Sequence, residues 1–184
     1  QVTWFSDEAQ KKLFRQTIQQ TRFRDANAHV MFNIARARLS MPEGFTEGKR
    51  WFASRELPNG LFVWEGHAHG TFMGEMIGIA GMINEYLLQS VGNKLRLFPC
   101  WPEDQDAAFS RMRAQGGFIV SASFKGGRVE SATIESVARK QLVLLSPWKT
   151  MQVNGRKAEI SKDGLVVTDT KPGDVLVLSE GDRQ

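Results

Sequence analysis

A single carboxylate stands in an otherwise apolar stretch of the chain. Glu75 is the only acidic residue between Glu65 and Glu85, and its neighbours are mostly methionine, isoleucine, glycine and alanine. A carboxylate in such surroundings loses hydration, which raises its pKa unless a partner compensates, and general acids and bases are tuned in this way. The alternative is a carboxylate satisfied by backbone N–H groups at a helix N-terminus. The spacing leaves both interpretations open, and Glu75 is the candidate catalytic residue.

A His-x-His pair precedes this carboxylate. His67 and His69 follow Glu65, and in an extended segment their spacing puts both side chains on the same side. A metal site also needs a third ligand at a suitable spacing, and the only other histidine, His29, lies far upstream. We therefore predict no metal site. Two interpretations remain open, namely contact with a substrate or its protons and a purely structural pair.

Aromatic residues surround the same segment. Trp51 and Phe52 come before the histidines, and Trp64 and Phe72 lie beside them. Aromatic rings are platforms for sugar rings, and they also fill ordinary hydrophobic cores. Their gathering beside two histidines and two acids indicates a ligand pocket. The predicted substrate-binding residues are His67, His69, Trp64, Glu65 and Trp51.

The composition excludes several classes of partner. The 184 residues include 24 Lys and Arg against 20 Asp and Glu, and the basic residues are spread out, whereas nucleic-acid-binding proteins concentrate them in a stripe. No apolar run approaches the roughly 20 residues that span a bilayer. The single cysteine, Cys100, cannot form an intrachain disulfide or a Cys-rich zinc site, and we interpret it as a small buried residue. Gly116-Gly117 lacks the following helix that a dinucleotide motif needs. We expect no cofactor, no nucleic acid and no membrane among the partners.

The first half of the chain has a helical period. Helices are predicted over 7–22, 26–40 and 71–90. The stretch 43–70 is predicted to be irregular, because it is polar and contains glycine. The helix over 71–90 is apolar nearly all round, which is typical of a helix buried in a larger core, and Gly92 suits its C-terminal cap. The polar patch at the start of the second helix is interpreted as a cap and a solvated face, and it contains Arg24, Asp25, Asn27 and His29.

From residue 94 the period becomes that of strands. Phe118, Val120, Ala122 and Phe124 alternate with polar or smaller residues, and Gly126-Gly127 is typical of a two-residue hairpin. Serines at 121, 123, 131 and 136 are expected at exposed strand positions. Residues 129–136 also alternate, and further strands are predicted at 140–146, 150–153, 157–161, 164–168 and 174–179. Short strands between turn dipeptides predict an antiparallel β-sandwich. The fold class is therefore α+β, with one domain over 1–92 and a second over 93–184.

Several motifs in the middle of the chain resemble the C-terminal part of glycoside hydrolase family 95 and its unclassified relatives. They are Ile83-Asn84-Glu85-Tyr86-Leu87-Leu88-Gln89-Ser90, then Leu95-Arg96-Leu97-Phe98-Pro99-Cys100-Trp101-Pro102, Asp106-Ala107-Ala108-Phe109 and Arg113-Ala114-Gln115-Gly116-Gly117-Phe118. Their order and spacing match from about residue 60 to about residue 148. The resemblance implies that 1–92 are the last helices of an (α/α)6 catalytic barrel and that 95–184 form the terminal β-sandwich.

The resemblance also implies an activity. Family 95 enzymes are secreted or periplasmic, exo-acting α-L-fucosidases and related enzymes that invert configuration with two carboxyl groups. Their members carry an acid about ten residues before the Glu that corresponds to Glu85, so Glu75 is similar to the base-side carboxylate. Met76 and Ile77 follow it where the family has asparagine. The general acid lies upstream in the family, so the remainder of the barrel is an expected partner beside the carbohydrate substrate, and this chain alone is expected to be inactive.

Two other functions stay open at this point. One is a non-catalytic carbohydrate-binding or interaction module built from helices and a sandwich. The other is a metal-dependent lyase or epimerase of the same barrel type, in which His67 or His69 transfers the proton.

Overall fold

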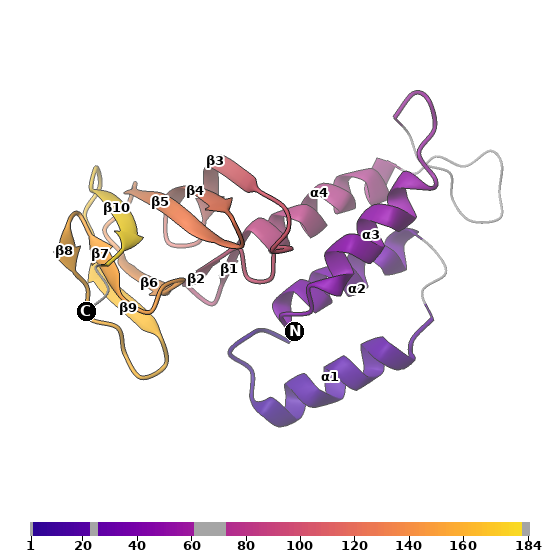
Figure 1. Ribbon diagram of the computed structural model, residues 1–184, viewed down its shortest axis with the longest axis horizontal. Helices are drawn as coiled ribbons and strands as arrows, with labels where there is room; N and C mark the ends of the chain where they lie inside the picture. The colour runs from indigo at the N-terminus through magenta and orange to yellow at the C-terminus, as the bar shows by residue number, and fades with distance from the viewer. Residues whose placement is uncertain (1, 23–25, 61–72, 182–184) are drawn as a thin grey trace. The chain divides into compact units, whose positions relative to one another are not determined.

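The computed structural model describes residues 2–22, 26–60 and 73–181. These residues form four helices and two mostly antiparallel sheets, which confirms the α+β class. They divide into two compact units. The helical unit holds the helices together with Pro99–Pro102, and the β unit holds Leu87–Phe98 and the chain from Glu103 onward. The helices, labelled in Figure 1, are α1 (Glu8–Gln20), α2 (Ala26–Arg38), α3 (Glu43–Ala53) and α4 (Met73–Leu87).

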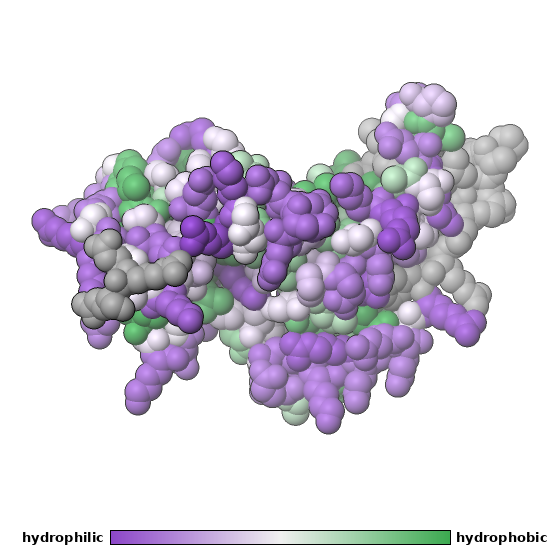
Figure 2. Space-filling view, viewed as in Figure 1, coloured by the Kyte–Doolittle hydropathy of each residue, from purple (hydrophilic) through white to green (hydrophobic). Residues whose placement is uncertain are grey.

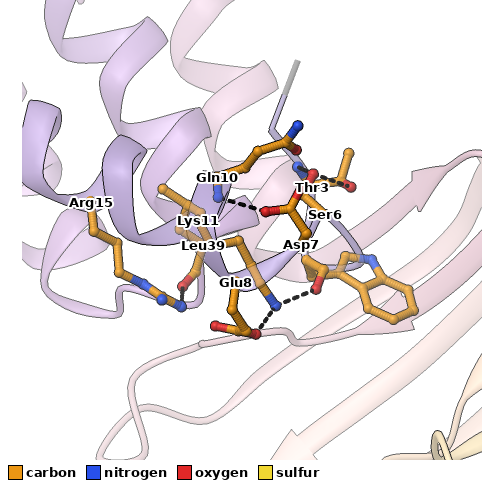
Figure 3. Close-up of polar contacts among 9 residues, drawn as sticks. Thr3, Ser6, Asp7, Glu8, Gln10, Lys11, Arg15 and Leu39 are labelled. Atoms are coloured by element: carbon orange, nitrogen blue, oxygen red, sulfur yellow. Dashed lines mark hydrogen bonds and ion pairs between the residues drawn. The ribbon is translucent and has the colours of Figure 1, made fainter.

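The first helix begins where the sequence predicts it. Asp7 is its N-cap, and its carboxylate accepts a hydrogen bond from the backbone N–H of Gln10 at 2.8 Å. Lys11 forms an ion pair with Glu8, as Figure 3 shows. Only Ile18 of this helix is buried, and the visible surface of α1 is mostly hydrophilic (Figure 2). The helix therefore depends on its cap and on one apolar anchor.

Helix α3 lies in the stretch that the sequence predicts to be irregular, so that prediction is wrong. Gly44, Phe45, Gly48 and Phe52 are buried and recur at the three- and four-residue steps of one helix face. Glycines lower helix propensity, but tertiary packing compensates here. A Cβ atom at Gly48 would lie 2.7 Å from the side-chain nitrogen of Asn33. The glycine therefore allows α2 and α3 to approach closely.

Helix α4 packs on α2 and ends earlier than predicted. A Cβ atom at Gly78 would lie 2.9 Å from Val30, so this glycine marks a close approach between the two helices. Leu88–Val91 is the first strand rather than the last helical turn. Gly92 and Asn93 both have positive φ and form the hairpin turn that follows, so the prediction of a helix cap at Gly92 is wrong.

The β unit contains both sheets. One sheet has the order β1-β2-β6-β9, in which β2 and β6 are parallel, and the other has the order β3-β4-β5-β10-β7-β8. The strands are β1 (Leu88–Val91), β2 (Lys94–Leu97), β3 (Ala107–Ala114), β4 (Phe118–Lys125), β5 (Arg128–Ser136), β6 (Gln141–Leu145), β7 (Met151–Val153), β8 (Arg156–Lys157), β9 (Leu165–Asp169) and β10 (Val175–Glu180). The sequence does not predict β1 or β3, and the strand predicted at 157–161 is confined to β8.

Strand β5 shows why simple alternation fails. Ser123 of β4 pairs with Ser131, but its neighbour Phe124 pairs with Val129, so Glu130 is an extra residue in a bulge. The bulge shifts the phase of the strand, and Val129 becomes buried on the same side as Ala132. Ser136, predicted to be exposed, is only 2% exposed, so that prediction is wrong.

Candidate functional site

Most of the predicted site residues lie outside the described part of the chain. Trp64, Glu65, His67 and His69 all fall in the segment 61–72. Glu75 belongs to the first turn of α4, and its side chain is likewise outside the described residues. Their roles stay predictions. Trp51 is the one predicted site residue whose side-chain contacts can be given.

Trp51 lies near the end of α3 and is half-buried. The imidazole of His29 stacks on its indole with ring centres 4.1 Å apart and an interplanar angle of 23°. The guanidinium carbon of Arg55 lies 4.2 Å from the centre of the indole ring. Phe52 packs edge-on at 5.0 Å. These contacts hold Trp51 in one orientation and surround it with cationic or hydrogen-bonding groups.

The stacking of His29 on Trp51 changes the interpretation of His29 and limits how Trp51 could contact a sugar. His29, interpreted from the sequence as part of a solvated helix start, contacts the indole instead. Stacking of a sugar ring on Trp51 would need an uncovered face of the indole, and the indole surface under the imidazole or the guanidinium is already covered. Trp51 can therefore contact a sugar only through the remainder of the ring. The sequence does not predict the contacts of His29 and Arg55 with Trp51, because these contacts depend on how the helical segments pack.

An ion pair fixes α4 against α2. The guanidinium of Arg38 donates from Nη2 to Glu85 Oε1 at 2.6 Å and from Nε to Glu85 Oε2 at 3.1 Å. Both side chains are 18% exposed. This hydrogen bonding raises the pKa of Arg38, against the opposing effect of burial. Two parallel bonds of this kind are directional, so Glu85 has a positioning role on the helix that also carries Glu75.

The core beneath this ion pair is built around Tyr86. Its ring is completely buried and packs against Phe45 at 5.4 Å, while its hydroxyl donates to the backbone carbonyl of Met41 at 3.3 Å. Burial is the main cause that raises the pKa of Tyr86 well above its usual range, and the thiol of Cys100 adds to it. A buried hydroxyl that resists ionisation cannot act as an acid near neutral pH. Tyr86 is therefore a structural residue.

The short segment Pro99–Pro102 returns from the strands to the helical unit. Trp101 packs on Phe45 with ring centres 4.4 Å apart. The thiol of Cys100 donates to the carbonyl of Ala37 at 3.7 Å. Cys100 is half-buried rather than fully buried as predicted, because it lies at the edge of this core. The segment thus closes one side of the helical core.

Open grooves that the sequence does not predict lie on the β unit, and two of them are lined by described residues. One has a volume of about 370 Å³ and lies between the loops that leave β5 and β9. The other, of about 530 Å³, lies beside the β4–β5 hairpin, where Arg128 forms an ion pair with Glu180 at 3.3 Å. Most of the residues that line either groove are charged.

Comparison with known proteins identifies no family for this chain, and the described residues show neither a metal site nor a membrane-spanning helix. Comparison with protein-family models gives no match, and comparison with curated proteins gives no similar sequence. Among residues 2–22, 26–60 and 73–181, no three His, Cys, Asp or Glu side chains gather in a way that could hold a metal ion. Within the same ranges, no helix has the length and apolar character needed to cross a membrane. The fold and the described contacts thus define an α+β protein with a helical unit and a β unit.

Proposed function

We propose that this chain is the C-terminal part of an inverting, exo-acting glycoside hydrolase similar to the α-L-fucosidases of family 95. In this proposal the helical unit supplies the last helices of an (α/α)6 barrel, and the β unit is the terminal antiparallel sandwich. The substrate is the terminal sugar of an oligosaccharide or polysaccharide, and the enzyme acts outside the cytoplasm. The motifs between Ile83 and Phe118 carry the family assignment.

The observation that best supports the proposal is the uncovered apolar surface of the helical unit. Ile77 of α4 is 71% exposed, Met31 of α2 is 64% exposed and Leu13 of α1 is 62% exposed. A Cβ atom at Gly81 would meet nothing within 4 Å. Large apolar side chains exposed on α1, α2 and α4 are typical of a surface that further protein covers. Neighbouring helices of a barrel would cover them.

In the proposed reaction Glu75 accepts a proton from the attacking water. Inverting glycosidases place their two carboxyl groups roughly 6.5–9.5 Å apart, which leaves room for that water. The second carboxyl group protonates the leaving oxygen and is expected from the upstream part of the barrel. Glu85 lies ten residues after Glu75, about 15 Å along the helix. Its ion pair with Arg38 would hold α4, and with it Glu75, in a fixed orientation.

The predicted substrate contacts belong to the segment between α3 and α4. His67, His69, Glu65 and Trp64 supply hydrogen-bonding groups and one aromatic ring close to Glu75 in sequence. Trp51, stacked with His29, would add an edge of indole and a donor from the end of α3. A few polar groups beside aromatic rings are typical of a pocket for a small ligand such as a sugar.

The test is substitution of Glu75 in the complete protein, including its upstream region. Glu75→Gln keeps the size of the side chain and removes its basicity, so kcat for an aryl α-L-fucoside should fall by about 10²–10⁴-fold while KM changes little. Glu43→Gln is the matched control, because Glu43 is an exposed carboxylate of α3. NMR of the first product should show the anomer of inverted configuration.

Three results would contradict the proposal. Unchanged turnover in Glu75→Gln would favour the non-catalytic carbohydrate-binding module. An unsaturated sugar as product would favour the lyase. If Glu43→Gln and Glu75→Gln reduced the turnover of the complete protein equally, neither carboxylate would have a specific role.

A further inference from the structure

The 370 Å³ groove of the β unit lies between two loops that are far apart in the sequence. One loop follows β5 and contains Arg139 and Lys140, and the other follows β9 and contains Thr170 and Lys171. Its volume falls within the range of roughly 300–1,000 Å³ that is usual for sites of small ligands. A volume of this size can hold one monosaccharide ring, and an open groove can admit one unit of a longer chain.

Hydrogen bonds connect the two loops and make the groove rigid. The hydroxyl of Thr170 donates to the carbonyl of Lys140 at 2.6 Å, and its oxygen lies 2.8 Å from the hydroxyl of Ser136. The backbone N–H of Gly173 donates to the carbonyl of Ser136 at 2.8 Å. Thr170 and Ser136 are 3% and 2% exposed. A site held in shape before the ligand arrives loses less entropy on binding.

The carboxylates that line the groove have hydrogen-bond partners, whereas its cationic side chains have no ion-pair partner among the described residues. The carboxylate of Asp174 accepts from the backbone N–H of Lys171 at 2.8 Å, and that of Asp169 accepts from the side-chain amide of Gln141 at 3.0 Å. Among the described residues, no carboxylate forms an ion pair with Arg139, Lys140 or Lys171. Three cations are therefore available to an anionic ligand, and their mutual repulsion is reduced when one binds.

We propose that this groove binds an acidic sugar unit of a polysaccharide, one that carries a carboxylate or a sulfate ester. The cations would contact the anionic group, and the remaining acceptor oxygens of Asp169 and Asp174 would accept from ring hydroxyls. The choice of a saccharide rests on the proposed function.

Binding to the whole chain can be measured without any turnover, so the result is independent of Glu75. The probes are an oligogalacturonate, a sulfated galactan oligosaccharide of equal length and a neutral galactan oligosaccharide, each titrated by calorimetry. The test variant is Lys140→Gln with Lys171→Gln. The matched control is Lys125→Gln with Arg128→Gln in the second groove, which changes the net charge by the same amount.

We expect at least one acidic probe to bind, the neutral one to bind at least about tenfold more weakly, and the test variant to lose about tenfold in affinity. The control variant should bind as the unchanged chain does. The two acidic probes distinguish carboxylate from sulfate. The proposal is overturned if no acidic probe binds, if both double variants weaken binding equally, or if a single-stranded oligonucleotide binds as tightly as the acidic sugar.

Discussion

The single tyrosine of the chain allows a direct test of the helical core. Tyr86 is completely buried, and its burial raises the pKa of its hydroxyl above the usual value of 10.0. The unfolded chain releases this proton near pH 10, whereas the folded chain keeps it. Above about pH 10 the folded state therefore binds more protons than the unfolded state, so the stability falls as the pH rises. Below that pH the contribution of Tyr86 is fully present.

The size of the effect follows from linkage. Each pH unit above the unfolded pKa removes about 1.4 kcal/mol per group, so about 2 kcal/mol is lost at about pH 11.5. Urea unfolding followed by circular dichroism measures this loss. Tyr86→Phe is the control, because it cannot ionise and loses only the hydrogen bond to Met41, worth about 1 kcal/mol or less. The unchanged chain should be more stable than this variant near pH 8 and less stable near pH 11.5, with other titrating groups cancelling in the comparison.

Tyrosinate absorbance supplies the refuting measurement. Because no other tyrosine is present, an absorbance rise reports Tyr86 alone. It should appear only when the far-ultraviolet signal of the folded chain disappears. If tyrosinate forms with a midpoint near pH 10 while the native signal persists, the core around Tyr86 is not closed and the reasoning fails.

Two further predictions concern packing. Gln89 is completely buried, and among the described residues neither polar atom of its side chain has a hydrogen-bond partner. Gln89→Met should therefore raise the unfolding free energy by about 1–2 kcal/mol. A lower unfolding free energy of this variant, measured by urea unfolding, would contradict this prediction. A Cβ atom at Gly44 would lie 2.3 Å from the hydroxyl of Tyr86, so Gly44→Ala should cost about 1–3 kcal/mol. Gly81→Ala, where a Cβ atom meets nothing within 4 Å, is its control and should stabilise by up to about 1 kcal/mol; equal losses in both variants would contradict this account.

The sequence predicts elements well where one local signal dominates. The helix predicted from residue 7 begins at the cap Asp7, and the dipeptide Gly126-Gly127, with positive φ at both residues, predicts the β4–β5 hairpin. The prediction fails where packing outweighs local preference. The glycines of α3 lower its helix propensity, and the close packing on the neighbouring helix that they allow cannot be seen in the local sequence. The bulge at Glu130 changes the phase of β5, and the composition of the strand does not indicate it.

The candidate site depends on contacts that no local pattern contains. His29 and Trp51 are 22 residues apart, and they stack only because α2 and α3 pack together. The charged groove has the same origin, since Lys140 and Lys171 come from loops that follow different strands. The residue types that can do chemistry are visible in the sequence, but which of them meet is decided by tertiary packing.

The two sides of α4 differ in a way that bears on Glu75. Ile77, Ala80 and Asn84 follow one stripe of the helix and are exposed, whereas Gly78 packs on Val30 and Met82 is only 1% exposed. Glu75 precedes Met82 by seven residues, about two turns of the helix.

The sequence leaves two roles open for Glu75, a base made stronger by lost hydration or a partner of the helix N-terminus, and Glu75→Gln separates the two. The first role predicts lost turnover with little change in unfolding. The second predicts a loss of about 0.3–1 kcal/mol in stability with turnover retained.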